Sequence, residues 1–428
     1  MKVELEYGRE GLVVELPDEL DVRVIRKQPM AVLRDEVRAV HDALAHPNSC
    51  APLGELARGK RSACILICDI TRPVPNHLFL QPMIRTLLQA GIPASGITVL
   101  VATGLHRPNE GEELAKVVGD PWVLETVTVA NHLARDIDAH VDLGRTSRGT
   151  PVKLNRRFVD AELRIATGLV EPHFMAGYSG GRKVIAPGVA HEDTIRTLHS
   201  ARFMEDPLAV QCNLSGNPLH EEQLEIMGML GSAYALNTVI DENRRLAYVN
   251  FGEVVESHLQ AVAFAADTCT VAVDRRFKTL VTSSAGYPLD RTYYQTVKAM
   301  VTPMDILDAG SNLIVASDCS EGLGSSEFRD AQARLLEHGP EAFLADLLTK
   351  AYADIDEWQT EMQIKPMRRS NIHLYTRGLS AADRQLTGVH IADSIESAVA
   401  ASVTETGDPT VAIIPEGPYV VPKFVGDV

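Results

Sequence analysis

Two histidines follow apolar runs of the kind that form buried strands. His106 lies in ATGLHRP directly after ITVLV, and His173 lies in GLVEPHF after LRIAT. A histidine at a strand end titrates near neutral pH and can act as a general base. Two imidazoles facing one cleft would place a base on each face of a substrate, as a racemase or epimerase requires. Two metal ligands, or one structural and one catalytic histidine, are the other interpretations, and a capping or surface role would also explain His106.

The most specific feature is the string AGYSGGRKVIAPG. Its glycines, Gly177, Gly180 and Gly181, allow a tight turn and close approach of the backbone to a ligand. Lys183 follows at once, and a lysine on such a loop suits phosphate binding or covalent attachment. A Walker A loop is excluded because Val184 follows the lysine and the glycine spacing is wrong. No GxGxxG follows a strand, which disfavours an ordinary dinucleotide-binding fold.

Further polar groups lie at other strand ends. Asp69 and Arg72 in DITRP are expected to form a carboxylate–guanidinium pair on a turn that Pro73 stiffens. The aspartate could hold ribose hydroxyls and the arginine a carboxylate or phosphate, or the two could form a structural ion pair. His199, in HEDTIRTLHSARF, lies on a predicted helix, where a satisfied core histidine is the commoner case.

A second group lies in the carboxyl-terminal third. The stretch YYQTVKAM opens a predicted helix with Tyr294, Gln295 and Lys298. Gln295 and Lys298 are three residues apart and therefore share a helix face. They could close over a ligand from a second domain, although an ordinary helix surface would explain them equally well.

The elements that must position these residues alternate between buried strands and helices. This order predicts an α/β fold of two domains, with mainly parallel sheets flanked by helices and the active site in a cleft at the strand carboxyl ends. Residues 1–272 are expected to form the domain with the lysine and the histidines, and 273–428 a domain that closes over the substrate. The last strand-like run, TVAIIPEGPYVVP, is a candidate for returning to the first domain. Helices are predicted at 77–90, 192–204, 291–302 and 328–350, a surface loop at 205–222, and a hinge at 270–280.

Composition limits the choice of partners. The 428 residues include 57 acids and 41 basic residues, for a net charge of −16, so nucleic acid is a poor candidate partner and any anion site must be a local basic pocket. No apolar run is long enough to span a bilayer, and the start does not look like a secretory signal. The cysteines show no CxxC pair and are expected to be free thiols: Cys50, Cys64, Cys68, Cys212, Cys269 and Cys319. Free thiols suit a reducing compartment, so we expect a cytoplasmic protein.

Five motifs in order, DITRP, ATGLHRP, EPHFMAGYSGGRK, LHSARFM and YYQTVKAM, make the chain resemble the nickel-dependent lactate racemase family from about residue 65 to 300. The resemblance implies a nickel-pincer nucleotide, a pyridinium mononucleotide with two sulfur-bearing arms. A lysine of the family is joined to this cofactor and matches Lys183, and a nickel-ligating histidine matches His199. The resemblance further implies that cofactor-biosynthesis proteins supply the group.

The same resemblance assigns the other motif positions. His106 and His173 match the two acid/base histidines, and Asp69, Ile70, Thr71 and Arg72 match residues that contact the nucleotide, with Arg72 also at the substrate. Gln295, Lys298 and Tyr294 fall at substrate-binding positions.

The activity implied is inversion at C2 of a 2-hydroxy acid. In the family's scheme one histidine removes the hydroxyl proton while the C2 hydride passes to the cofactor, and a planar 2-keto acid then takes both back on its other face. Lactate is the default substrate, and the pocket wall is expected among Leu105, Phe174, Met175, Tyr294, Met300 and Trp358. A lyase or dehydrogenase at the same site, or a non-catalytic protein that binds the cofactor or an organic acid, are the alternatives.

Overall fold

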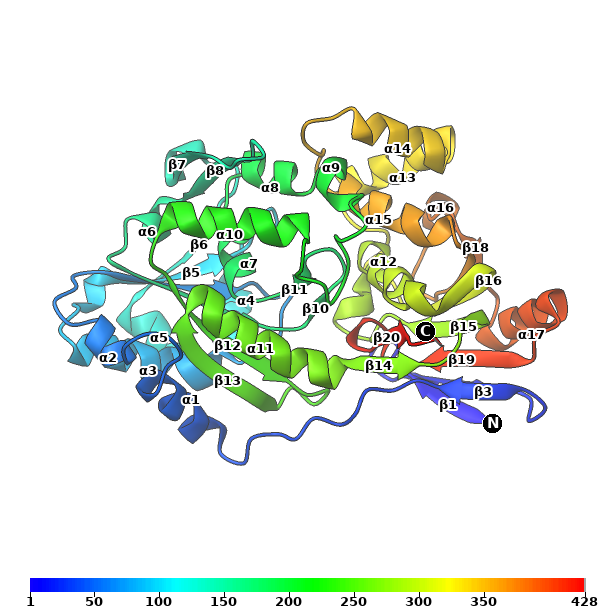
Figure 1. Ribbon diagram of the computed structural model, residues 1–428, viewed down its shortest axis with the longest axis horizontal. Coiled ribbons are helices and arrows are strands. Elements are labelled where there is room, and N and C mark those ends of the chain that lie inside the picture. Colours follow the sequence, from blue (N-terminus) through cyan, green and yellow to red (C-terminus); the bar gives the residue numbers. More distant parts are fainter. Residues whose placement is uncertain (427–428) are drawn as a thin grey trace. The chain divides into compact units, whose positions relative to one another are not determined.

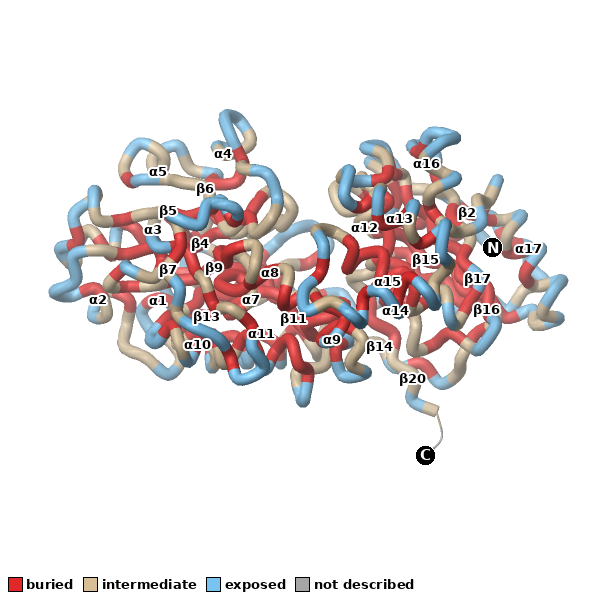
Figure 2. The backbone as a smooth tube through the Cα atoms, turned by 90° about the horizontal axis from the view of Figure 1, so that it is seen from above, coloured by how far each residue is buried: buried red, intermediate tan, exposed pale blue. Residues whose placement is uncertain are grey.

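The computed structural model describes residues 1–426 and divides into two compact units. We call residues 29–199 and 206–268 the central unit, and residues 1–28, 200–205 and 269–428 the terminal unit. Each has its own sheet and its own buried interior, which appears red in Figure 2.

The central unit is built on a six-stranded sheet with the order β13–β12–β9–β4–β5–β6. Its strands are β4 (Ala63–Cys68), β5 (Ile97–Ala102), β6 (Thr128–Asn131), β9 (Leu163–Leu169), β12 (Tyr234–Ile240) and β13 (Leu246–Glu253). All neighbours pair in parallel except β12 and β13, which are antiparallel. The strand β4 reads ACILIC and is almost wholly buried, as expected for a parallel strand with both faces covered.

Helices cover both faces of this sheet. One face packs on α1 (Glu36–Ala45), α2 (Leu53–Leu56), α3 (Asn76–Gln89), α4 (Gly111–Val118) and α5 (Pro121–Thr126) around a single apolar cluster. The other face carries α6 (Arg156–Val159), α7 (Arg182–Ile185), α10 (Pro218–Leu230) and α11 (Val254–Cys269), as Figure 1 shows. The helix α8 (Glu192–Leu198), the hairpin of β7 (His140–Arg145) and β8 (Pro151–Asn155), and the short pair β10 (Pro172–His173) and β11 (Gly177–Tyr178) complete the unit.

The terminal unit has a second six-stranded sheet, entirely parallel, with the order β18–β17–β16–β15–β19–β3. Its strands are β3 (Asp21–Val24), β15 (Phe277–Ser283), β16 (Leu307–Ala316), β17 (Ser370–Tyr375), β18 (His390–Ile391) and β19 (Thr410–Ile414). The hairpin of β1 (Lys2–Leu5) and β2 (Leu12–Glu15) packs with α17 (Ile395–Thr406) on one face. The remaining elements are α9 (Ala201–Met204), α12 (Tyr293–Val301), α13 (Ser326–His338), α14 (Pro340–Leu348), α15 (Glu357–Met367), α16 (Ala381–Leu386), and the parallel pair β14 (Thr270–Val273) and β20 (Val421–Phe424).

The predicted fold class is confirmed, whereas the course of the chain between the units differs from the expected division. Residues 1–28 lie in the terminal unit rather than with the histidines, because β3 pairs with β19; the blue and red strands lie side by side in Figure 1. The run TVAIIP forms β19 between β15 and β3, so it does not return to the central unit.

Two of the predicted helices and the predicted loop also need correction. The stretch 192–204 forms two helices, because Ser200 begins a new one at Ala201, and 328–350 is broken at Gly339 and Pro340. The expected loop at 205–222 contains the start of α10, capped by the Asn217 side chain. No helix within residues 1–426 combines the length and apolar character that a membrane span needs.

Candidate functional site

Three segments at the carboxyl end of the central sheet hold Asp69, Arg72, His106 and His173, whereas Lys183 and His199 lie further along the chain, in α7 and at the end of α8. The three segments follow β4, β5 and β9, which are adjacent in the sheet. The chain runs from β4 to β5 and β6 on one side, and β9 and β12 lie on the other, so the order reverses beside β4. Such a switch point is where open α/β sheets bind their ligands.

The loop after β4 is organised by the Asp69 carboxylate. Its Oδ1 accepts hydrogen bonds from the backbone N–H of Thr71 (3.2 Å) and from the Thr71 hydroxyl (2.6 Å). Its Oδ2 lies 2.6 Å from Nδ1 of His106, in the loop after β5. The neighbouring backbone N–H of Ile70 donates to Asn109 Oδ1 at 3.3 Å, which ties the same two loops together. Asn109 was not predicted, and its buried amide gives no sequence signal beyond its place in the loop.

The His106 side chain is half exposed, whereas Asp69 is buried. Burial by itself would raise the pKa of Asp69, but the bonds from His106 and Thr71 and the Arg72 charge outweigh it, so that the pKa lies below its usual value. The carboxylate is therefore ionised at neutral pH beside the imidazole.

His173 is held by its own turn. It lies in β10, is 7% exposed, and its Nδ1 accepts from the backbone N–H groups of Met175 (3.4 Å) and Ala176 (3.2 Å). Phe174 stacks at a tilt, with ring centroids 5.1 Å apart. The two histidines thus have different partners at Nδ1: a carboxylate for His106 and N–H donors for His173.

Arg72 has a partner that the sequence analysis missed. Its Nη1 lies 2.5 Å from Oε1 of Glu171, which follows β9, and both side chains are partly buried. Beside the electrostatic attraction between Arg72 and Asp69, two bonds cross the switch point, Asp69 to His106 and Arg72 to Glu171. The signal for Glu171 was present, since this acid stands two residues before His173 in the strand-end motif EPH.

The glycines of SGGRK pack against protein atoms. Gly180 and Gly181 have φ of +76° and +47°, and a Cβ at these positions would lie 2.7 Å from Val170 and 2.6 Å from the His258 ring. Only glycine meets both requirements. The tight turn was anticipated, but these contacts are with the protein itself rather than with a ligand.

Lys183 is partly buried in α7, near Arg72, Cys68 and Glu171. Burial, helped by the Arg72 charge, lowers the pKa of Lys183 from 10.5 to about 7. The amine is consequently neutral for a large part of the population at physiological pH.

His199 ends α8 and lies within electrostatic reach of Lys183. Its Nδ1 donates to the Ile195 carbonyl at 2.8 Å, which places the lone pair of the neutral ring on Nε2. Burial lowers the pKa of His199 to about 4, so the ring stays neutral above that pH.

The remaining predicted residues lie in the terminal unit, on α12. Tyr294 accepts at its hydroxyl from Trp358 Nε1 (3.1 Å), and burial raises the pKa of Tyr294. Gln295 Oε1 is a buried oxygen without a hydrogen-bond partner among the described residues. Lys298 lies one turn further along the same helix. Met300, proposed from sequence for the pocket wall, is fully buried in the interior of the unit.

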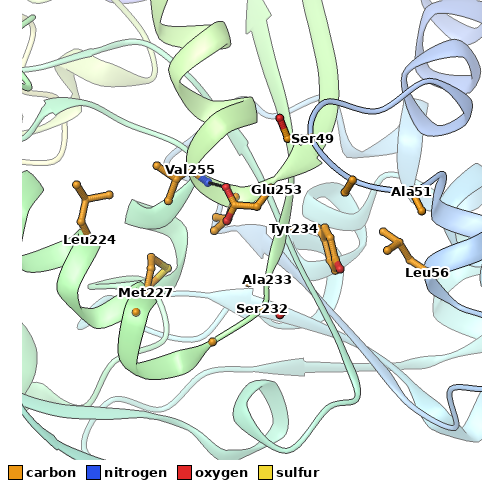
Figure 3. Close-up of a pocket in the computed structure, with 14 residues that line it drawn as sticks. Ser49, Ala51, Leu56, Leu224, Met227, Ser232, Ala233, Tyr234, Glu253 and Val255 are labelled. Atoms are coloured by element: carbon orange, nitrogen blue, oxygen red, sulfur yellow. Dashed lines mark hydrogen bonds between the residues drawn. The ribbon is translucent and has the colours of Figure 1, made fainter.

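A pocket of about 560 Å³ lies elsewhere in the central unit, where β12 begins and β13 ends (Figure 3). It contains none of the predicted residues, and it lies at the amino end of the parallel strands. The Glu253 carboxylate there accepts from the N–H groups of Val255 and Glu256 and thereby caps α11. We assign the pocket no part in the candidate site.

The fold and the site define a doubly wound α/β protein whose polar side chains gather at a switch point. Residues 7–211 match the family model described as lactate racemase N-terminal domain, and residues 274–421 match lactate racemase C-terminal domain. Lactate racemase from Thermoanaerobacterium thermosaccharolyticum is 31% identical over 356 residues, which cover 80% of this chain and 83% of that protein. Lactate racemase from Lactiplantibacillus plantarum is 28% identical over 98% of this chain and 99% of that protein. The chain belongs to the lactate racemase family.

Solved structures agree with this result. The lactate racemase apoprotein from T. thermosaccharolyticum superposes with a TM-score of 0.91 at 27% identity, covering 99% of this chain and all of that one. A protein from Thermotoga maritima superposes with a TM-score of 0.69 at 17% identity, covering 93% of this chain and 100% of that one, and shares the fold.

Proposed function

We propose that the protein is an isomerase that inverts C2 of a 2-hydroxy acid, with lactate as the first candidate substrate. The proposal is supported mainly by the position of His106, His173, Lys183 and His199 around one switch point of the central sheet. The chain that carries this sheet belongs to the lactate racemase family. Inversion needs a proton acceptor on one side of C2 and a donor on the other, and two histidines of unlike environment supply both.

The residues of the central unit fit a covalently attached nickel-pincer nucleotide. Lys183 offers a partly neutral amine at pH 7, as covalent attachment requires. His199 offers a neutral imidazole with its lone pair on Nε2, as a metal ligand requires. Within residues 1–426 no three His, Cys, Asp or Glu side chains form a metal-binding group. A cofactor that brings its own sulfur and carbon donors needs only the one histidine.

In this proposal Lys183 holds the nucleotide and His199 the nickel, while residues 69–72 line the nucleotide. Bound there, the group would supply an acceptor for the C2 hydride, which would avoid a carbanion next to a carboxylate.

The protein's own side chains bind the substrate and move its hydroxyl proton. His106 accepts the proton at Nε2, and His173 serves the opposite face. The Arg72 guanidinium is a planar fork of N–H donors that suits a carboxylate, and we assign it to the substrate carboxylate. Tyr294, Gln295 and Lys298 are proposed as further substrate-binding residues, and the buried Gln295 oxygen supports a polar ligand beside α12.

The test uses protein purified from its own host, or produced together with the cofactor-building proteins on which we expect it to depend. Intact mass and nickel content are measured first, and a panel of chiral 2-hydroxy acids is then followed by chiral chromatography. Added nucleotide mass, about one nickel per chain and loss of optical purity are expected. Net formation of a keto acid or alkene would favour a dehydrogenase or lyase, and binding without turnover would favour a carrier.

A further inference from the structure

We propose that Asp69 is a positioning residue that fixes the tautomer of His106 and so decides which ring nitrogen can accept a substrate proton. The inference rests on the proposed function, which makes His106 an acid/base group. It gives the Asp69 side chain a task apart from nucleotide contact, and it makes the two histidines chemically unequal.

The two carboxylate oxygens of Asp69 have different hydrogen-bond partners. Oδ1 accepts both donors of Thr71, its backbone N–H and its hydroxyl, and this orients the carboxylate. Oδ2 is thereby directed at His106 Nδ1, 2.6 Å away. A short contact to a buried carboxylate identifies a charge-assisted hydrogen bond.

The direction of this bond follows from charge. Asp69 is ionised, so its Oδ2 can only accept, and Nδ1 of His106 must carry the hydrogen. In the neutral ring the lone pair is then on Nε2. This nitrogen points away from Asp69 because the two nitrogens lie on opposite sides of the ring.

His173 has the reverse arrangement. Its Nδ1 accepts from two backbone N–H groups and must carry the lone pair, so the hydrogen of the neutral ring is on Nε2. The protein therefore sets His106 as a hydrogen-bond acceptor at Nε2 and His173 as a hydrogen-bond donor at the same atom. The two rings thus start in different tautomers, and only His106 presents a lone pair at Nε2 in its neutral form.

Replacing Asp69 by asparagine tests the argument sharply. In Asp69→Asn the amide oxygen remains at the Oδ1 position, because both Thr71 donors require an acceptor there. The amide NH₂ must then face His106 Nδ1, which can only respond as an acceptor. The hydrogen moves to Nε2 and the lone pair needed for proton abstraction is lost, although the shape of the site is kept.

The experiment is ¹⁵N NMR of the full chain with labelled histidine, recorded without cofactor at neutral pH. His106→Gln identifies the signals of His106. In the wild type we expect a protonated Nδ1 and an unprotonated Nε2 for His106, and the reverse for His173. In Asp69→Asn the His106 pattern should invert while the His173 pattern stays. The matched control is Asp193→Asn, which changes a carboxylate 3.3 Å from His191 Nδ1 and should leave the His106 signals unchanged.

A wild-type spectrum with the hydrogen of His106 on Nε2 would overturn the proposal, even if Asp69→Asn did not fold. An unchanged His106 pattern in folded Asp69→Asn would do the same. In the cofactor-loaded enzyme, the variant should lose racemisation by about 10⁴-fold in kcat, the cost of a wrong histidine tautomer in a Ser–His–Asp triad. If the spectra behave as expected but the loaded wild type does not racemise any 2-hydroxy acid, the positioning role stands and the proposed function fails.

Discussion

The ionisation of Lys183 is the property on which covalent attachment depends. An ordinary exposed lysine has a pKa near 10.4, so about one amine in 2,500 is neutral at pH 7. Burial, with the Arg72 charge as the next cause, lowers the pKa of Lys183 to about 7. About half of the Lys183 amines should then be neutral at pH 7, on the order of a thousandfold enrichment in the nucleophilic form.

The assay is a pH titration of the cofactor-free protein after reductive ¹³C-methylation, in which each dimethyl-lysine signal reports its own protonation. Lys183→Met identifies the signal, and the exposed Lys60 serves as the internal reference. Because the pKa is lowered, the amine should be neutral above about pH 7 and take up its proton as the pH falls through that value.

A midpoint above about pH 9 for the Lys183 signal would refute the reasoning, since the desolvation on which it depends would be too weak to matter. A midpoint near 7 that rises by a fraction of a unit in Arg72→Met would support both causes, because removing a nearby positive charge favours the protonated amine. Arg72→Lys, which keeps the charge, is the matched control and should leave the midpoint close to the wild-type value.

Three further predictions concern catalysis and stability. His106→Ala and His173→Ala should each abolish interconversion of both enantiomers, because every cycle uses both rings; near-normal turnover of either variant by chiral chromatography would exclude the two-base scheme. Arg72→Gln should raise KM for the substrate by roughly 10–100-fold through loss of a charge-assisted bond, and an unchanged KM would contradict the assigned carboxylate contact. Burial, with Glu205 nearby, raises the pKa of Glu361 to about 8, so the folded chain retains a proton between pH 4.5 and 8 that the unfolded chain has released. The free energy of unfolding should therefore fall with rising pH in this window, by up to about 1.4 kcal/mol per unit. Glu361→Gln should remove that slope, so its effect on the free energy of unfolding should differ between pH 5.5 and pH 7.5. An equal effect at the two pH values in urea unfolding would contradict the prediction.

Much of the architecture was predictable because buried parallel strands have a strong local signal. The runs ACILIC, ITVLVA and LRIATGL each form a strand where expected, and the predicted helix 77–90 is α3 within one residue. These features depend only on apolar periodicity and on turn residues nearby.

The errors have two causes: the placement of one strand depends on a distant partner, and two helix boundaries have local signals that the predictions did not use. Residues 21–24 form a strand, and only their pairing with β19 determines which sheet they join. The break at Gly339 and Pro340 has a signal in the sequence, because a proline is favoured at the first position of a new helix. Asn217, whose side chain caps the start of α10, is a second local signal of this kind.

The choice of partners in the site could not be predicted, because it is decided by strand order. Asp69 and Arg72 are three residues apart and of opposite charge, which favours a local pair in any sequence analysis. In the folded chain β4 lies between β5 and β9, so each side chain meets a group from a different neighbour: Asp69 meets His106, and Arg72 meets Glu171.

This division of partners changes the expected electrostatics of the site. A count of residues suggests a strongly basic pocket in an acidic protein, with Arg72, Arg182 and Lys183 close in sequence or space. Arg182, however, is fully buried against His258 rather than a carboxylate, and burial lowers its pKa to about 9. Arg72 shares its charge with Glu171, and Lys183 is partly neutral at pH 7. The positive charge for a 2-hydroxy acid must therefore come mainly from Arg72 within the central unit. Attachment of a cofactor at Lys183 would remove little positive charge from the site, since the amine is only partly protonated at pH 7 beforehand.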